Sequence, residues 1–396
     1  MVTVSEAKEK IILSIKPLPL VTKSTESALG YVLAKDVLAP LSLPSFRQSS
    51  MDGFAVIHSD ITALGVQLKI VNESKAGQAD DQILKSGEAI RIFTGAPVPE
   101  GATAVVMQEH TERINDEIVI HEFPVSLGKN VRNIGQQITK GNVALPKDTF
   151  LSPGSIGFLL GMNVEDVVVY QKPKIGILVT GDELAKKGDK LNPGQVYESN
   201  SGMLVAALHQ EGIQDVEIKY CRDDLHSTIA ALAELSEQND VVLTSGGISV
   251  GDYDFVGKAL EAIEAETVFY KVKQKPGKPL LFAKKQEKLF FALPGNPASS
   301  LVCYYEYVLP AIRKMSGRTD CFLRSLFMPV KNAYSFQGER DEFLKATATQ
   351  ESVTPLDGQE SFSIRSFAIA NAIIYLPAEQ NMVAEGDMVE VHLLPG

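Results

Sequence analysis

The chain has 396 residues, of which 44% are hydrophobic and 22% are charged, a composition typical of folded globular domains. At roughly 100–200 residues per domain, this length predicts about two to four domains. The formal net charge is −11 and no long basic run occurs, so nucleic acid is not expected as the main partner.

The cysteines and the apolar runs indicate the cellular compartment. Cys221, Cys303 and Cys321 form no CxxC pair, which argues against a zinc site or a disulfide framework and suits a reducing cytoplasm. No apolar run approaches the ~20 residues of a membrane span, and the first residues lack the basic and apolar regions of a secretory signal. We therefore expect a cytoplasmic protein with no membrane partner.

The first half of the chain is predicted to be rich in strands. An amphipathic helix is expected over residues 5–16, and it stops at Pro17. Residues 40–150 contain short apolar runs separated by Gly, Pro and Asn-Asp turns, which predict strands. These runs are 66–71, 89–93, 104–108 and 117–121. A short helix at 153–161 and a strand at 164–170 follow.

Apolar strand-like runs then alternate with helical runs. The predicted strands are 175–180, 216–220, 241–244 and 289–293, and the predicted helices are 201–210, 225–237, 255–263 and 298–315. This alternation predicts a doubly wound, mostly parallel sheet at about 172–318. Beyond residue 320 the helical pattern ends. Val389, Val391 and Leu393 alternate with polar residues, which predicts a small C-terminal β-barrel or sandwich.

Four loops are expected to share one rim of this sheet, because ligands of open parallel sheets bind outside the carboxyl ends of the strands. The loop at 245–251 is rich in glycine and precedes a helix. Its residues Ser245, Gly246, Gly247 and Ser249 would let backbone N–H groups approach a phosphate. The alternative is an ordinary tight turn.

Acidic residues follow the strands at the same rim. Glu183, Asp223 and Asp254 could hold Mg²⁺, which prefers carboxylate and phosphate oxygens. Helix N-capping is the alternative for Asp254 and for Asp223 with Asp224. Glu183 is a poor N-cap residue, so a functional role is favoured for it.

A basic segment and a proline-rich loop complete the rim. Strand alternation would place Lys271, Lys273 and Lys275 on one face, and a Pro-Gly turn would bring in Lys278 as part of an oxyanion site. An edge strand protected by lysines is the alternative. In the loop at 294–297, Asn296 followed by Pro297 has a structural explanation as the start of a helix, with Asn as the N-cap and Pro as the first helical residue. Pro294-Gly295 has no such explanation and suggests a rigid loop shaped to a ligand.

Six segments, taken together and in order, resemble the molybdopterin molybdenumtransferase family of the bacterial MoeA type, which is related to the E domain of gephyrin. The segments are 51–55, 91–100 (RIFTGAPVPE), 180–184 (TGDEL), 244–251 (TSGGISVG), 275–279 (KPGKP) and 293–297 (LPGNP). On composition alone, the first two would be surface turns. The resemblance spans nearly the whole chain.

The resemblance implies a multidomain fold and a homodimer. The expected parts are an N-terminal helix at 1–17 that packs on the α/β domain, a linker domain at 18–42 and 136–170, a β-rich domain at 43–135, a molybdopterin-binding α/β domain at 171–318 and a C-terminal β-barrel at 319–396. The active site would lie between the α/β domain of one subunit and the C-terminal domain of the other.

The resemblance also implies a reaction. Adenylylated molybdopterin and molybdate would react with the help of Mg²⁺, AMP would leave, and molybdenum would stay on the pterin dithiolene. The implied catalytic residues are Asp52, Thr94, Glu183, Asp223 and Asp254, the last three also as Mg²⁺ ligands. The implied substrate and oxyanion residues are Lys271, Lys275, Lys278, Pro294, Pro297, Ser299, Lys345 and Ser366. Contact with other proteins of cofactor biosynthesis is a further implication.

The chain departs from the family pattern at three positions. Gln137 stands where Asp is usual, Lys345 where Arg is usual, and Arg365 where Ser is common. Lys345 keeps the charge but loses the bidentate fork, and Arg365 could restore that fork beside the oxyanion. These changes leave a non-catalytic scaffold open as an alternative. A molybdopterin adenylyltransferase is a second one, although the long N-terminal part and the C-terminal barrel argue against it.

Overall fold

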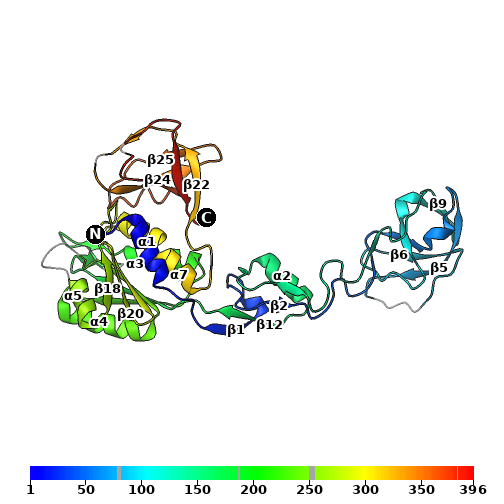
Figure 1. Ribbon diagram of the computed structural model, residues 1–396, viewed down its shortest axis with the longest axis horizontal. Helices are drawn as coiled ribbons and strands as arrows, with labels where there is room; N and C mark the ends of the chain where they lie inside the picture. Colours follow the sequence, from blue (N-terminus) through cyan, green and yellow to red (C-terminus); the bar gives the residue numbers. More distant parts are fainter. Residues whose placement is uncertain (78–81, 186–187, 249–254, 337, 381) are drawn as a thin grey trace. The chain divides into compact units, whose positions relative to one another are not determined.

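The computed structural model describes residues 1–77, 82–185, 188–248, 255–336, 338–380 and 382–396 (Figure 1). The chain forms two compact units. One comprises Met1–Lys23, Gly30–Ala34 and Val168–Gly396, and the other comprises Ser24–Leu29 and Lys35–Val167. The first unit contains the α/β domain and the C-terminal domain, and each unit is described by itself.

The α/β domain is built on one mixed sheet with the strand order β16-β13-β17-β21-β20-β18. The parallel strands are β16 (Val216–Cys221), β13 (Ile175–Thr180), β17 (Val241–Ser245) and β21 (Lys288–Leu293). The sheet is extended by β20 (Leu281–Lys285), antiparallel to β21, and by β18 (Glu266–Tyr270), antiparallel to β20. The predicted mostly parallel sheet is confirmed.

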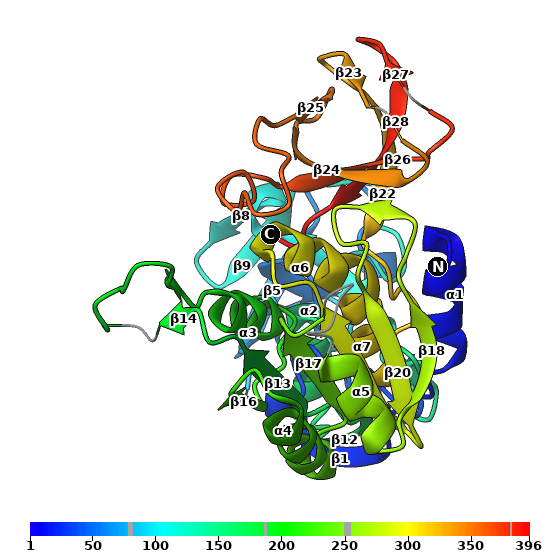
Figure 2. The ribbon, with the colours of Figure 1, turned by 90° about the vertical axis from the view of Figure 1, so that its left-hand side faces the viewer.

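Helices cover both faces of this sheet, as Figures 1 and 2 show. On β13, Ile177 and Val179 pack into the core that contains α1, α3, α6 and α7, whereas Leu178 packs into the core of α4 and α5. The strand is buried along its whole length, which explains its continuous apolar sequence. The helices are α1 (Val4–Leu13), α3 (Asn200–Gln210), α4 (Leu225–Gln238), α5 (Phe255–Ala262), α6 (Pro297–Cys303) and α7 (Leu309–Met315). The doubly wound arrangement is therefore confirmed.

The apolar run predicted as one helix at 298–315 is divided in the structure. A π-helical turn at Tyr304–Val308 separates α6 from α7. Its residue Glu306 is only 3% exposed. It accepts hydrogen bonds from Lys8 Nζ at 2.6 Å and from His392 Nδ1 at 2.7 Å. The π-helical turn thus places one buried carboxylate where α1, the α/β domain and the C-terminal domain meet.

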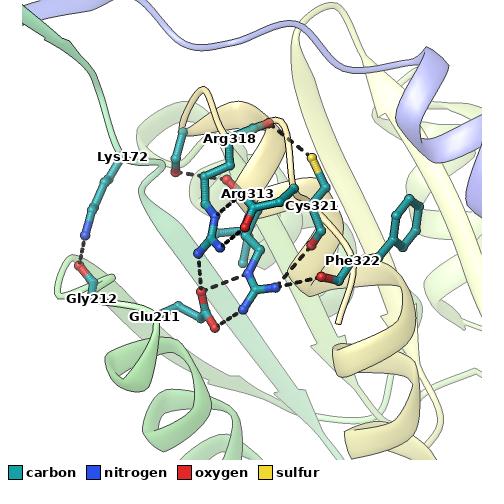
Figure 3. Close-up of polar contacts among 10 residues, drawn as sticks. Lys172, Glu211, Gly212, Arg313, Arg318, Cys321 and Phe322 are labelled. Carbon is teal, nitrogen blue, oxygen red and sulfur yellow. Dashed lines mark hydrogen bonds and ion pairs between the residues drawn. The ribbon is translucent and has the colours of Figure 1, made fainter. Parts of the chain in front are cut away.

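A second polar cluster holds the segment that leads from α7 to the C-terminal domain (Figure 3). Arg313 binds the Glu211 carboxylate through Nε at 3.0 Å and Nη2 at 2.6 Å, and its Nη1 donates to the Phe322 carbonyl at 3.0 Å. Arg318 pairs with Asp320 at 2.7 Å. Glu211 follows α3 directly, so the cluster fastens this segment to the far end of that helix.

The C-terminal domain contains a curled sheet in the order β19-β24-β26-β28-β22, with β25 paired to β24. Its strands are β22 (Arg324–Pro329), β24 (Asp341–Ala348), β25 (Val353–Pro355), β26 (Ala372–Leu376) and β28 (Met388–Leu393). A bridge between Val330 and Val353 joins the β22 end to β25 and closes the curl around one apolar core. This β-rich domain agrees with the predicted barrel. The first strand, β19 (Gln274–Lys275), comes from the α/β domain and pairs parallel with β24.

The second unit contains a mixed sheet in the order β7-β4-β6-β5-β9-β8. Its strands are β4 (Gly53–Val56), β5 (Gln67–Ser74), β6 (Glu88–Ile92), β7 (Ala104–Met107), β8 (Thr111–Ile114) and β9 (Glu117–Ile120). The unit also includes α2 (Pro153–Gly161).

The remaining strand pairs of the chain are β1 (Leu20–Ser24) with β12 (Asp166–Tyr170), β2 (Val37–Leu38) with β11 (Val143–Leu145), β3 (Gln48–Ser49) with β10 (Val131–Arg132), β14 (Leu184–Ala185) with β15 (Val196–Tyr197), and β23 (Tyr334–Ser335) with β27 (Met382–Val383). Among the described residues, no helix has the length and apolar character needed to cross a membrane.

Candidate functional site

A cleft of about 450 Å³ lies at the carboxyl ends of β13, β17 and β21. Its walls are Thr180, the Ser245-Gly246 turn, the Pro294–Pro297 loop and the start of α3. The cleft contains residues of three of the four loops predicted to share one rim, namely those after β13, β17 and β21. The cleft therefore occupies the position at which open α/β sheets bind ligands.

Glycine is required where the loops approach one another. Gly246 has φ +90°, and a Cβ added there would lie 2.8 Å from the Thr180 carbonyl oxygen. A Cβ on Gly247, which has φ +66°, would lie 2.7 Å from Thr180 Oγ1. On the neighbouring loop, a Cβ added to Gly295 would lie 3.7 Å from Gly246 Cα. The glycines thus allow two backbone loops to form one narrow wall.

Replacing Gly246 with Ala is expected to lower the free energy of unfolding by about 1–3 kcal/mol, because the new Cβ has a strained φ and meets a backbone carbonyl. Urea unfolding measures this loss. Gly202→Ala is the matched control, since Gly202 lies within α3 with no atom within 4 Å of its added Cβ. The control should gain up to about 1 kcal/mol from helix propensity. Equal effects at the two positions would show that the turn tolerates a side chain.

Sequence reasoning missed Asn200, which ties two walls of the cleft together. Its Nδ2 donates to Ser245 Oγ at 2.9 Å and to the Gly295 carbonyl at 2.8 Å. The residue is only 8% exposed, and its Oδ1 has no hydrogen-bond partner among the described residues. Thr180 Oγ1, at the end of β13, is buried and equally unpartnered. Unpaired buried acceptors are costly, so both atoms suit a ligand that donates hydrogen bonds.

Two neighbouring acidic residues of the rim, Asp223 and Asp224, have different surroundings. Asp224, not Asp223, caps α4, because its Oδ1 accepts from the Ser227 N–H at 2.8 Å. Asp223 Oδ1 is buried and has no partner in the part of the chain that the structure describes. Burial raises the pKa of Asp223, and the negative charges of Asp182, Glu183 and Asp224 raise it further. Helix capping therefore accounts for Asp224, but it does not account for the buried carboxyl group of Asp223.

The predicted metal ligands are only partly described. Glu183 is exposed and its carboxylate folds toward Gly181, where an added Cβ would lie 2.9 Å from Oε2. Asp254 and Ser249 lie outside the described residues. Within the described ranges, no group of three or more His, Cys, Asp or Glu side chains is arranged to hold a metal by itself.

The basic segment is not the continuous strand that alternation predicted. Lys271 has φ +69°, so the chain turns directly after β18, and its ammonium lies 4.6 Å from the centroid of the Tyr270 ring. Lys275 Nζ pairs with the buried Glu342 carboxylate at 3.0 Å. Lys273 and Lys275 are nevertheless exposed while Val272 and Gln274 are buried, as alternation predicted, so the departure from the predicted strand is the turn at Lys271. The edge-strand alternative agrees with the structure, because β19 is the end strand of its sheet and pairs with β24. Lys278 is exposed.

The contacts of Lys345 differ from those expected of the oxyanion-binding residue that it was predicted to be. It is 1% exposed, and its Nζ donates to the carbonyls of Gly358 at 2.6 Å, Glu360 at 3.2 Å and Ser363 at 3.0 Å. Burial lowers the pKa of Lys345. An ammonium has three donors, and all three are engaged, so none is left for an oxyanion. These contacts speak against the oxyanion role predicted for Lys345, and the role predicted for Arg365 stays a prediction.

The other C-terminal and α6 residues form a contact between domains. Ser366 Oγ donates to the Gly358 carbonyl at 2.8 Å. Asn296 precedes α6 as predicted, but its side chain donates to Ser361 Oγ at 2.8 Å and makes no cap hydrogen bond. Ser299 is buried, and its N–H donates to the Ser361 carbonyl at 3.3 Å. Pro294 and Pro297 line the cleft as predicted.

The two remaining predicted catalytic residues lie in the second unit. Asp52 Oδ1 accepts from the Thr94 N–H at 2.7 Å and from the Thr94 hydroxyl at 2.8 Å. These hydrogen bonds hold the pKa of Asp52 below its usual value. The contact joins the segments at 51–55 and 91–100. Gln137 lines a separate cavity of about 420 Å³ in the same unit.

Three family models match successive parts of the chain. They are described as the MoeA N-terminal region (domain I and II) for residues 2–162, a probable molybdopterin binding domain for residues 176–314, and the MoeA C-terminal region (domain IV) for residues 328–394. Together they cover both units of the structure.

Relatives and solved structures match over the full length. The chain is 33% identical to the molybdopterin molybdenumtransferase of Haemophilus influenzae, with complete coverage of both. It is 31% identical to that of Staphylococcus aureus, with 99% of this chain and 95% of the relative covered. A crystal structure of a molybdopterin biosynthesis MoeA protein from Pyrococcus horikoshii covers both chains completely, with a TM-score of 0.82 and 30% identity. Together with the matching family models, these similarities show that the chain belongs to the molybdopterin molybdenumtransferase (MoeA) family.

Proposed function

We propose that this chain inserts molybdenum into molybdopterin: it takes adenylylated molybdopterin and molybdate, releases AMP and yields the molybdenum cofactor. The observation that carries the proposal is the cleft at the carboxyl ends of the parallel strands. It combines a glycine wall, the Asn200 and Thr180 oxygens that have no hydrogen-bond partner in the described part of the chain, and the lining residue Glu183, whose charge acts on Asp223. The names of the relatives support the same reaction class.

The residues of the cleft suit the two ends of such a substrate. A pterin carries amino and ring N–H groups, and Asn200 Oδ1 and Thr180 Oγ1, which have no partner within the described ranges, could accept hydrogen bonds from them. The Gly246-Gly247 turn has no side chains, so a phosphate can approach its backbone closely. Catalysis of this kind rests on positioning the phosphoanhydride and stabilising its charge electrostatically.

Mg²⁺ is proposed as the metal that assists the reaction. The residues fit it, because Asp223 Oδ1 has no hydrogen-bond partner among the described residues, and burial and the neighbouring acids both raise the pKa of this carboxyl. Asp223 and Glu183 would hold the ion, and Mg²⁺ needs only one or two carboxylates when substrate phosphates and waters supply the rest. When bound, it would neutralise charge on the phosphoanhydride oxygens. Asp254 remains a predicted ligand.

Incubation with adenylylated molybdopterin and Mg²⁺ tests the proposal. We expect AMP release to depend on added molybdate. An adenylyltransferase would instead consume ATP when given molybdopterin, and a scaffold would bind the pterin with neither reaction. Either of those results would overturn the proposal. The full-length similarity to molybdenumtransferases favours the first outcome.

We further propose that the chain acts as a homodimer, as the family resemblance implies. Light scattering on the purified full chain should give twice the mass of one chain at the concentration used for activity. A monomer with full activity would contradict this. Within one chain, Ser361 already contacts Asn296, so a partner's C-terminal domain is not needed to support this wall of the cleft.

A further inference from the structure

A loop of the C-terminal domain, residues 356–363, is organised around the buried end of Lys345. The ammonium donates to the carbonyls of Gly358, Glu360 and Ser363, which gather the loop around one point. The Gln359 amide adds two bonds to the Lys345 backbone, with its Oε1 accepting at 3.0 Å and its Nε2 donating at 2.9 Å. Removing the ammonium would therefore remove the hydrogen bonds that hold the loop together, while the strand that carries Lys345 would remain.

The outer side of the same loop contacts the wall of the cleft. Ser361, between two of the carbonyls bound by Lys345, accepts the Asn296 amide through Oγ at 2.8 Å and the Ser299 N–H through its carbonyl at 3.3 Å. Asn296 and the neighbouring Pro297 line the cleft. A continuous series of hydrogen bonds thus runs from Lys345, through the loop, to the cleft.

We propose that Lys345 is a positioning residue: its ammonium holds loop 356–363 so that Ser361 fixes the Asn296-Pro297 wall against the substrate. This inference rests on the proposed function for the identity of the substrate. It replaces direct oxyanion binding by Lys345 with action through the loop.

The chemistry of the site suits lysine. An ammonium directs three donors outward from one point, which matches three converging carbonyls, whereas a guanidinium presents a planar fork. The loop is also tight, because Gly358 has φ +75° and an added Cβ would lie 2.9 Å from Ser363 Oγ.

Hydrogen exchange on the full chain tests the positioning without any substrate. Lys345→Met keeps the length of the side chain and removes its charge and donors. We expect faster exchange in the loop and also at the Ser299 amide, which loses its fixed acceptor. Lys331→Met, at an exposed lysine of the same domain, is the matched control and should change neither region. Unchanged exchange at Ser299 in Lys345→Met would overturn the proposal.

Substrate binding separates positioning from direct oxyanion contact. Without molybdate, Lys345→Met should bind adenylylated molybdopterin about tenfold more weakly, the effect of one lost charge-assisted hydrogen bond. Ser361→Ala should weaken binding in the same direction, and the double variant should be no weaker than Lys345→Met. If Lys345→Met raises only the KM for molybdate, the lysine contacts the oxyanion and the proposal is wrong. If the unaltered chain binds no adenylylated molybdopterin, the proposed function fails, while hydrogen exchange still tests the positioning.

Discussion

Replacing Asp223 with Asn is expected to reduce molybdate-dependent AMP release by about 100-fold or more, the scale seen when one electrostatic group is removed from an active site. The same change should leave the fold as stable or slightly more stable. Asp223 Oδ1 makes no hydrogen bond to the described residues, and its charge is opposed by Asp182 and Glu183. Removing that charge therefore relieves repulsion in the folded protein.

Asp224→Ala is the matched control, because Asp224 neighbours Asp223 but caps α4. It should lose about 1 kcal/mol of stability and keep most of its activity. Both variants are compared by urea unfolding and by the rate of AMP release at saturating Mg²⁺. The reverse pattern, with Asp223→Asn active and unstable, would make Asp223 a structural residue and remove it from the proposed site.

Replacing Glu306 with Gln is expected to destabilise the first unit by about 3–5 kcal/mol, the usual effect of removing one partner from a buried ion pair. Lys8 and His392 would then share a buried site without a counter-charge. Burial alone would raise the pKa of Glu306, but the positive charges of Lys8 and His392 lower it to about 2. Urea unfolding of the full chain measures the loss. A change in the free energy of unfolding below about 1 kcal/mol would contradict a charged Glu306 where α1, the α/β domain and the C-terminal domain meet.

The contribution of His392 to stability should depend on pH. Burial opposes its charge, but Glu306 and hydrogen bonds to Glu306 and Glu390 raise its pKa from 6.5 to about 9. Lys8 opposes this rise, and Tyr375 stacks on the imidazole. Stabilisation of about 3 kcal/mol should thus be complete below pH 6.5 and disappear as the pH rises through 9.

The opposite limit is set by Glu306, whose contribution is present above pH 4.5 and is lost as the pH falls through about 2. Both shifts describe one ion pair, so their free energies are not added. His392→Phe is the test: its difference in unfolding free energy from the unaltered chain should shrink steadily between pH 6.5 and 9. A difference that is constant over that range would show that His392 is uncharged.

The parallel strands could be predicted because burial on both faces leaves a continuous apolar sequence. β13 is observed at the predicted bounds, and β17 and β21 each differ by one residue at one end. β18 and β20 were missed, because a short antiparallel pair at the sheet edge has no helix between its strands to mark it. Alternation predicted that Lys273 and Lys275 would be exposed, but it could not reveal the positive φ at Lys271, where the chain turns.

The loops of the site were predictable, whereas the side chains that connect them were not. Strand ends and glycines identified the Gly246 turn and the Pro294–Pro297 loop. Asn200 lies directly before the predicted helix at 201–210, and only the fold shows that it bridges β17 and the loop after β21. The burial of Lys345 depends on carbonyls that come together only when loop 356–363 folds back. Such roles arise from tertiary contacts that leave no local pattern in the sequence.

The most direct test of the central claim is the stoichiometry of AMP release and molybdenum transfer in one sample. The purified full chain is mixed with adenylylated molybdopterin and Mg²⁺, with and without molybdate, and AMP and pterin-bound molybdenum are quantified together. We predict that AMP appears only with molybdate and that each AMP is matched by one molybdenum on the pterin. AMP release that is independent of molybdate, or pterin-bound molybdenum without AMP, would contradict molybdenum insertion as the function of this chain.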